Sequence, residues 1–293
     1  MRITVFTPTY NREYILGKLY ESLKRQTFTD FEWLIIDDGS EDDTKKLVEK
    51  WSKEKKEFSI RYYFFENSGK QREINRALDL ARGELFFTVD SDDILTNDAL
   101  EKIDCWEKAL PKDKKFCGLA GSDGDMTGKA TNPLFKGEYI DATFLNRYAE
   151  TGLFIGHDRP WVLYTEVHKK YKYPEFEGES FITEAVAWNR MAQDGYQIRC
   201  FNDVIYMREH QEDGLTYSIL RTLIANPRGY GLWLNEMMQQ LDYSYMKRLK
   251  VYYSFYSDLR ETYQWRDIVN FINASKLEMF LIKICFGLKH RRK

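Results

Sequence analysis

The most informative segment is Glu84-Leu85-Phe86-Phe87-Thr88-Val89, followed at once by Asp90-Ser91-Asp92-Asp93. Its first part is rich in aromatic and β-branched side chains, which predicts a buried strand that begins after Gly83. This strand would deliver three carboxylates into one loop. Because clustered carboxylates repel one another, a site that keeps them together usually holds a cation. An Asp-rich turn that caps the next helix is the alternative.

The spacing of these carboxylates favours a divalent metal. Asp90 and Asp92 lie two residues apart, and irregular backbone at a strand end lets both reach one ion. Mg²⁺ and Mn²⁺ prefer oxygen ligands, and proteins commonly hold them with one or two carboxylates together with substrate phosphates. The segment therefore predicts a Mg²⁺ or Mn²⁺ site.

Strands and helices alternate in the N-terminal part of the chain. Strands are predicted at residues 2–6 and 33–36, and an amphipathic helix at 15–23. A second helix follows Ser40, which with Asp43 makes a start resembling a capping box. A third covers residues 70–82 and is closed by Gly83. This order predicts right-handed crossovers and a mostly parallel sheet with helices on both faces.

Three strand ends are predicted to meet in one crevice, because ligands of such sheets bind beyond the carboxyl ends of the strands. The segments concerned are Thr7-Pro8-Thr9-Tyr10-Asn11, Asp37-Asp38-Gly39-Ser40 and Asp90-Ser91-Asp92-Asp93.

These segments resemble the motifs of the family 2 glycosyltransferases, which have the GT-A fold. The matching segments are P-T-Y-N-R at 8–12, D-D-G-S at 37–40, D-S-D-D at 90–93, and 178–184 followed by W-N-R at 188–190. The resemblance covers about residues 1–215. It implies an α/β fold of GT-A type, a Rossmann-like, mostly parallel sheet flanked by helices. It also implies inverting transfer of a sugar from a nucleotide diphosphate donor, with a UDP-sugar favoured, in surface polysaccharide biosynthesis.

The resemblance also suggests site residues. It places the nucleotide near Pro8, Thr9, Tyr10, Asp38, Lys70 and Asp90, and the metal near Asp92, Asp90 and His210. Asp38 would accept a hydrogen bond from the base, and Lys70 would attract the diphosphate at a helix N-terminus. Each assignment has a structural alternative: a helix cap for Asp38, a solvated helix face for Lys70, and an ordinary surface residue for His210.

An inverting transfer needs a base that takes the proton of the acceptor hydroxyl. Many relatives have Glu-Asp at the start of the relevant helix, whereas this chain has Glu184-Ala185. Glu184 is therefore the predicted base, in the first turn of a helix, where a carboxylate also suits the helix dipole. Glu179 and Asp158 are the next candidates.

Composition excludes several other classes of protein. The formal net charge of −2 argues against a nucleic-acid binder. The four cysteines form no C-x-x-C pair, no P-loop or G-x-G-x-x-G occurs, and no signal peptide is visible, so a reduced cytoplasm is expected. The segment 123–128 resembles the start of an EF-hand, but Leu134 stands where a bidentate Glu is required. We interpret it as a mobile loop near the acceptor.

The C-terminal region, residues 216–293, is predicted to be helical and distinct from a glycosyltransferase domain at 1–215. Apolar periodicity predicts two packed helices near 232–241 and 249–256. The last segment, 276–293, has six Lys or Arg and a single acid, and its apolar run is too short to span a bilayer. This amphipathic tail either makes peripheral contact with the inner face of an anionic membrane, near a lipid-linked acceptor, or docks on the domain.

Two other functions are compatible with the pattern. A sugar-phosphate nucleotidylyltransferase would also bind nucleotide and metal, but it usually has a glycine-rich basic loop where this chain has residues 7–12. An inactive sugar-binding paralogue would keep the fold without turnover. A glycosyltransferase acting on a glycan or lipid-linked acceptor is the favoured prediction.

Overall fold

The structure is a computed structural model that describes residues 1–208 and 215–290, with side chains over 1–208 and 219–284. The chain divides into two compact units, which are described separately. Unit 1 comprises Met1–Lys172 and Arg190–Gln211, and unit 2 comprises Tyr173–Asn189 and Glu212–Lys293. These units are groupings by proximity, so the domain boundary near residue 215 stays a prediction.

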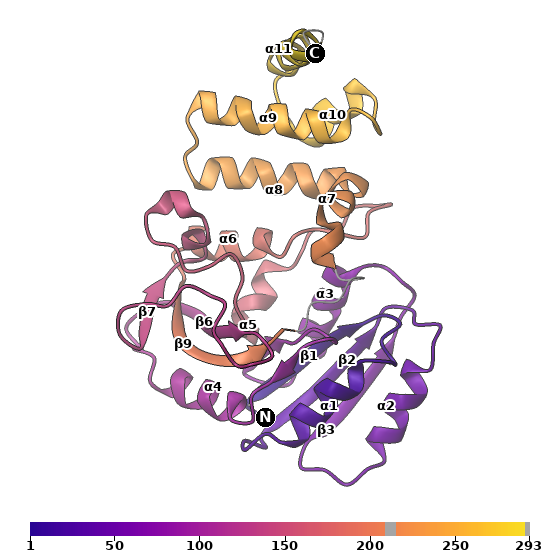
Figure 1. The fold of residues 1–293 in the computed structure, drawn as a ribbon, viewed down its shortest axis with the longest axis vertical. Helices are drawn as coiled ribbons and strands as arrows, with labels where there is room; N and C mark the ends of the chain where they lie inside the picture. Colours follow the sequence, from indigo (N-terminus) through magenta and orange to yellow (C-terminus); the bar gives the residue numbers. More distant parts are fainter. Residues whose placement is uncertain (209–214, 291–293) are drawn as a thin grey trace. The chain divides into compact units, whose positions relative to one another are not determined.

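Unit 1 is built on one sheet, which has nine strands among the described residues. The strands are β1 Ile3–Thr9, β2 Phe31–Asp37, β3 Ser59–Phe64, β4 Leu85–Thr88, β5 Ile94–Leu95, β6 Phe116–Gly124, β7 Tyr139–Ala142, β8 Trp161–Tyr164 and β9 Gln197–Met207. Their order is β3-β2-β1-β4-β8-β6-β9-β5, with β7 paired to β9. Figure 1 shows β1 and β2 side by side in the indigo-to-purple part of the ribbon. Strands β3, β2, β1 and β4 are parallel, and β8 runs antiparallel to β4. The predicted mostly parallel α/β sheet is confirmed.

Helices cover both faces of the parallel strands. On one face, α1 Leu16–Lys24, α2 Thr44–Ser52 and α4 Ala99–Lys108 pack into the main hydrophobic core. This core takes alternate residues of the strands, such as Val5, Trp33 and Phe87, because successive strand side chains point to opposite faces. On the other face lies α3 Lys70–Leu80, which contacts β1 and β2. Burial on both faces explains why the strands are almost continuously apolar.

The start of α2 differs from the predicted capping box. The residue before the helix is Asp43, and its side chain makes no capping hydrogen bond. Ser40 lies too early in the chain to cap the helix and instead joins two loops. Its N–H donates to Asp37, and its hydroxyl accepts from the backbone N–H of Asn11. The S-x-x-D spacing is misleading here because the turn at the end of β2 takes these groups first.

The remaining short elements of unit 1 are α5 Thr165–His168 and the 3₁₀ turns η1 Phe144–Arg147, η2 Ala149–Thr151 and η3 Lys169–Tyr171. The end of β9 is the part of this region that bears on the site. Met207 pairs with Ile94 of β5, directly after the Asp90–Asp93 segment. The last residues of β9 therefore lie beside the acidic loop.

Unit 2 begins with an irregular segment, residues 173–184, and its other described elements are helices. Its helices are the first residues of α6 Ala185–Gln193, then α7 Leu215–Ala225, α8 Pro227–Gln240, α9 Tyr245–Leu259, α10 Trp265–Phe271 and α11 Lys276–His290. Helices α8 and α9 correspond to the two predicted packed helices, and they bury Leu234, Met238 and Phe255 among others. Of the helices described, none combines the length and the apolar composition that are needed to cross a bilayer.

Candidate active site

Three loops of unit 1 meet at one edge of the parallel strands, as predicted. Thr9 at the end of β1 is in register with Asp37 at the end of β2, and the N–H of Asp38 donates to the Thr9 carbonyl at 2.9 Å. After β4, the Val89 N–H donates to the carbonyl of Phe6 at 2.8 Å. The hydrogen-bond ladder thus aligns the P-T-Y-N, D-D-G-S and D-S-D-D segments.

The loop after β2 is held by its own two carboxylates. Asp37 accepts from the Ser40 N–H at 2.7 Å and from the Tyr62 hydroxyl at 2.6 Å. Asp38 accepts from the backbone N–H groups of Ser68 at 2.7 Å and Gly69 at 2.9 Å. It therefore does not cap α2. It fixes the turn that leads into α3, which is the structural use that sequence reasoning missed.

The loop after β1 offers one exposed ring and one buried hydroxyl. Tyr10 is 47% exposed, whereas Thr9 is buried, and its Oγ1 has no hydrogen-bond partner within the described residues. Asn11 has a positive φ of 53° and its Oδ1 accepts from the Glu41 N–H at 2.8 Å, which ties this loop to the next. With Asn11 held by Glu41, the Tyr10 ring is the large side chain of this segment that is accessible to a ligand.

The acidic loop, Asp90–Asp93, concentrates negative charge at the same edge. Asp90 forms an ion pair with Lys70, with Oδ1 to Nζ at 2.8 Å. Burial opposes ionisation of Asp90, but the charges of Lys70 and Arg208 outweigh it and hold its pKa below the ordinary value. Burial and the neighbouring Asp90 raise the pKa of Asp92, and they raise that of Asp93 to about 7. The loop therefore holds carboxylates whose ionisation is unfavourable without a further cation.

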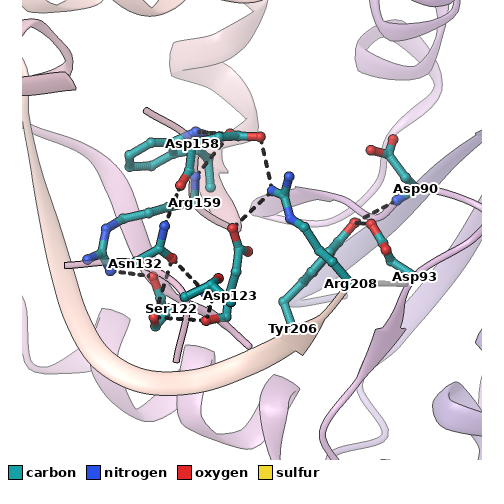
Figure 2. A network of polar contacts seen from close by, with 12 residues as sticks. Asp90, Asp93, Ser122, Asp123, Asn132, Asp158, Arg159, Tyr206 and Arg208 are labelled. Atoms are coloured by element: carbon teal, nitrogen blue, oxygen red, sulfur yellow. Dashed lines mark hydrogen bonds and ion pairs between the residues drawn. The ribbon is translucent and has the colours of Figure 1, made fainter. Parts of the chain in front are cut away.

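Tyr206 of β9 holds this loop in place, as Figure 2 shows. Its hydroxyl donates to Asp93 Oδ2 at 2.7 Å and accepts from the Asp90 N–H at 3.1 Å. Burial, with the charges of Asp93 and Asp90, raises the pKa of Tyr206 well above its ordinary value, so the phenol keeps the proton that it donates. The sequence contained no local signal for this contact, because Tyr206 lies more than a hundred residues away in the chain.

Arg208 extends the network toward β6 (Figure 2). Its Nη2 pairs with Asp123 Oδ2 at 3.1 Å and with Asp158 Oδ2 at 3.0 Å. Burial raises the pKa of Asp123 to about 7 against the opposing charge of Arg208. Asp123 and Gly124 lie in β6, and Asp123 is only 4% exposed, so the predicted mobile loop over 123–128 is wrong at its first two residues. The Gly and Asp content favours a turn, but the strand pairing of β6 with β9 overrides it.

Asp158 is occupied at both oxygens. Besides its ion pair with Arg208, its Oδ1 accepts from the indole N–H of Trp161 at 3.0 Å. The next residue, Arg159, is buried and donates to the carbonyls of Ile155, Gly121, Phe201 and Pro133. These four contacts hold the Asp158 segment in place. Asp158 is thereby a poor candidate for a base.

The donor set of the acidic loop fits a divalent metal. Asp90 and Asp92 supply hard carboxylate oxygens, and no cationic side chain of the described residues forms an ion pair with Asp92. Across residues 1–208 and 215–290, no three His, Cys, Asp or Glu side chains gather into a complete metal cage. Asp90 and Asp92 would fill only part of the coordination shell of such an ion, and other ligands would complete it. His210, the third predicted ligand, lies outside the described residues.

Glu184 and Glu179 belong to unit 2. Glu184 immediately precedes α6, one residue before the predicted first turn, and its carbonyl accepts from the Trp188 N–H at 3.3 Å. Glu179 is bound by the start of α8, because its two oxygens accept from the N–H groups of Arg228 at 2.8 Å and Gly229 at 2.9 Å. A carboxylate at that position satisfies otherwise unpaired helix N–H groups. Glu179 is therefore a structural residue.

Comparison with known protein families identifies the class of protein to which this fold and its acidic strand edge belong. A match to "Glycosyl transferase family 2" covers residues 4–170. The chain belongs to this family, and it is a glycosyltransferase of the GT-A fold.

Two curated relatives illustrate the range of the family. One is the GalNAc(5)-diNAcBac-PP-undecaprenol beta-1,3-glucosyltransferase of Campylobacter jejuni, which is 26% identical to this chain. The match covers 97% of this chain and 93% of the C. jejuni enzyme. The poly(ribitol-phosphate) beta-N-acetylglucosaminyltransferase TarS of Staphylococcus aureus is 30% identical over half of this chain. That match spans a quarter of the length of TarS.

Solved structures support the fold. The crystal structure of S. aureus TarS residues 1–349 in complex with UDP-GlcNAc matches with a TM-score of 0.66 and 21% identity, over 89% of this chain and 74% of that one. The Pyrobaculum calidifontis mannosyltransferase PcManGT, in complex with GDP-Man and Mn²⁺, matches with a TM-score of 0.55 and 19% identity. This match covers 81% of this chain and 64% of the PcManGT chain.

Proposed function

We propose that the protein transfers a sugar from a UDP-sugar to a glycan or lipid-linked acceptor, with inversion at the anomeric carbon, in the assembly of a surface polysaccharide. One observation carries the proposal. Among the described residues Asp92 forms no ion pair, and the acidic loop raises its pKa at the strand edge where ligands of parallel sheets bind. Such a loop is stabilised when a divalent cation and its phosphate ligands arrive.

The relatives support the substrate classes. The C. jejuni enzyme is a glucosyltransferase whose acceptor is linked through PP-undecaprenol. TarS has been crystallised in complex with UDP-GlcNAc. We therefore favour a UDP-sugar donor and a lipid-linked acceptor, used at the cytoplasmic side of a membrane.

Donor binding would use the loops after β1 and β2. Tyr10 offers an exposed ring against a flat base, next to Pro8 and Thr9 in the chain, and the Thr9 hydroxyl has no partner among the described residues. Asp38 Oδ1 accepts from the N–H and the hydroxyl of Ser68, whereas Oδ2 accepts from the Gly69 N–H and has a second lone pair that can accept a hydrogen bond from the base. The Lys70 ammonium group, which pairs with Asp90, would also attract the negatively charged diphosphate.

The metal would be Mn²⁺ or Mg²⁺, held by Asp92 with Asp90, and His210 stays a proposed third ligand. When bound, such an ion withdraws negative charge from a departing nucleotide diphosphate. Tyr206 keeps the loop in place by holding Asp93 and the Asp90 backbone. The chain thus supplies ligands whose positions are set before the substrate arrives.

Glu184 would act as the base. As the acceptor oxygen attacks the anomeric carbon, its proton passes to a Glu184 carboxylate oxygen and the bond to the nucleotide diphosphate breaks. The two competing candidates are engaged elsewhere, Glu179 with the α8 N-terminus and Asp158 with Arg208 and Trp161. Glu184 is proposed for its position immediately before α6, where the resemblance to the family places the base.

A pair of variants tests the base. Glu184→Gln should lower the transfer rate by roughly 10²–10⁴-fold with donor affinity nearly unchanged, which is the usual range for loss of a general base. Glu179→Gln is the matched control, and it should lower the melting temperature instead, because the α8 N–H groups lose a charged acceptor. If donor affinity falls in step with the rate in Glu184→Gln, the residue belongs to the donor site and the proposal for the base is wrong.

Donor identity is tested by thermal shift. UDP-, GDP- and dTDP-sugars would be screened with and without Mn²⁺, because a bound ligand raises apparent stability by mass action. The expected result is a metal-dependent shift with UDP-sugars, together with slow hydrolysis of the stabilising donor. Binding without hydrolysis or transfer would instead indicate an inactive sugar-binding paralogue.

A further inference from the structure

Helix α11 carries large apolar residues on two opposite faces. Met279 and Ile282 are buried, at 0% and 7% exposure. On the other side lie four residues with 68%, 51%, 50% and 43% of their surface exposed, namely Leu277, Phe280, Leu281 and Ile284. We call these four residues the α11 stripe.

The spacing of the α11 stripe is helical. Its members lie at i, i+3, i+4 and i+7, so with about 100° per residue they occupy one narrow side of the helix. Met279 and Ile282 lie on the opposite side. Since α11 packs against α9, the buried pair accounts for docking within unit 2, and the stripe is a separate surface.

An exposed stripe of this kind is not expected of an ordinary surface helix. Single exposed apolar residues are common, but neighbouring ones aligned on a helix mark an interaction surface. A helix that only docks on its own domain would place charged or polar residues at these four positions. The stripe is therefore a candidate binding surface for an occupant other than α9.

Charge identifies the chemistry of that occupant. Lys276 and Lys283 lie on one flank of the stripe and are exposed, and residues 276–293 contain six Lys or Arg against the single acid Glu278. An anionic lipid surface accepts both features, because the apolar side chains enter the acyl boundary and the lysines stay at the headgroups. A second copy of the chain would instead bring like charges together.

We propose that the α11 stripe inserts into the surface of an anionic membrane and anchors the protein there. The inference deepens the proposed function, because a surface anchor keeps the enzyme at the membrane that holds a lipid-linked acceptor. The proposed function explains what the anchor is for, but membrane attachment itself can be measured without turnover.

Vesicle flotation of the full-length protein tests the proposal. The probes are vesicles of phosphatidylcholine alone and of phosphatidylcholine with phosphatidylglycerol. The variant combines Phe280→Asp with Leu281→Asp, and the matched control is Leu134→Asp, a leucine of unit 1 that is 65% exposed. Wild type and control should float with anionic vesicles, and the double variant should bind at least about tenfold less. High salt should weaken wild-type binding, because it screens the lysines.

The readouts separate this inference from the proposed function. The double variant should retain its melting temperature and any nucleotide-sugar hydrolysis in solution. If the wild type floats and the double variant does not, but neither protein hydrolyses a donor, the α11 stripe is a membrane-binding surface and the proposed function is wrong. Equal flotation of wild type and double variant, or no flotation of the wild type, would overturn the inference. A dimer that the double variant dissociates, without any vesicle binding, would assign the stripe to a second copy.

Discussion

Two aspartate-rich loops lie at the same edge of the sheet and use their carboxylates in opposite ways. After β2, Asp37 and Asp38 accept hydrogen bonds from backbone N–H groups and from Tyr62. After β4, Asp92 has a raised pKa and no ion pair with a described residue, and the pKa of Asp93 is about 7. The first loop uses its charge to hold backbone, whereas the second holds two carboxylates, Asp92 and Asp93, whose ionisation its own surroundings disfavour.

The difference shows why similar motifs have dissimilar roles. An ionised carboxylate that accepts two or three N–H bonds is stabilised by them and acts as a local tie. A buried carboxylate beside another carboxylate is destabilised until a cation arrives. What separates D-D-G-S from D-S-D-D is therefore the supply of backbone donors, which comes from the Ser68–Gly69 turn in the first case.

The largest expected effect comes from removing one carboxylate from each loop. Asp92→Asn should abolish metal-dependent turnover while leaving the fold intact, because a hard ligand is lost. Asp37→Asn should instead lower the free energy of unfolding by about 1–3 kcal/mol, since two half-buried donors lose their charged, buried acceptor. Turnover against Mn²⁺ concentration and urea unfolding of both variants provide the measurements. Unchanged transfer by Asp92→Asn at saturating donor and metal would break the comparison.

A matched pair of tyrosines gives a smaller effect. Tyr206 donates to Asp93 and Tyr62 donates to Asp37, at 2.7 and 2.6 Å. Tyr206→Phe should raise the Mn²⁺ concentration needed for half-maximal activity by roughly tenfold, the equivalent of one net hydrogen bond. Tyr62→Phe should leave that concentration unchanged and lower only stability. Full activity of Tyr206→Phe at limiting Mn²⁺ would show that the Tyr206 contact is dispensable for the loop.

The smallest effect is on the pH dependence of stability. The folded state raises the pKa of Asp93 from 3.8 to about 7, so between these values the folded protein holds a proton that the unfolded chain has lost. The contribution is therefore present at low pH and is lost as pH rises through about 7. The free energy of unfolding of the wild type should therefore fall between pH 5 and 8. Asp93→Asn should make this fall smaller by on the order of 2 kcal/mol. Urea unfolding with EDTA at each pH measures it, and parallel curves for both proteins would contradict the assignment.

Local pattern was enough to predict the parallel part of the sheet and the edge that carries the site. The apolar periodicity correctly predicted three strands and two helices, namely β1, β2, β4, α1 and α3. It could do so because burial requires apolar residues at a regular spacing in each of these elements. The capping box at Ser40 and the loop at Asp123 were wrong, because in both cases tertiary partners competed with a local turn preference. The assigned roles of Glu184, Tyr10, Asp38 and Asp92 stay predictions.

The sequence by itself determined the family, the strand-and-loop order and the position of the acidic loop, since all of these depend on contiguous residues. Only the tertiary structure decided which carboxylates are already engaged. Glu179 binds the start of α8, Asp158 binds Arg208, and Asp93 is held by a tyrosine 113 residues away. It also decided which face of α11 docks and which is left exposed. The reason is that hydrogen-bond partners and burial are set by strand register and helix packing, and these join residues whose separation along the chain carries no local signal.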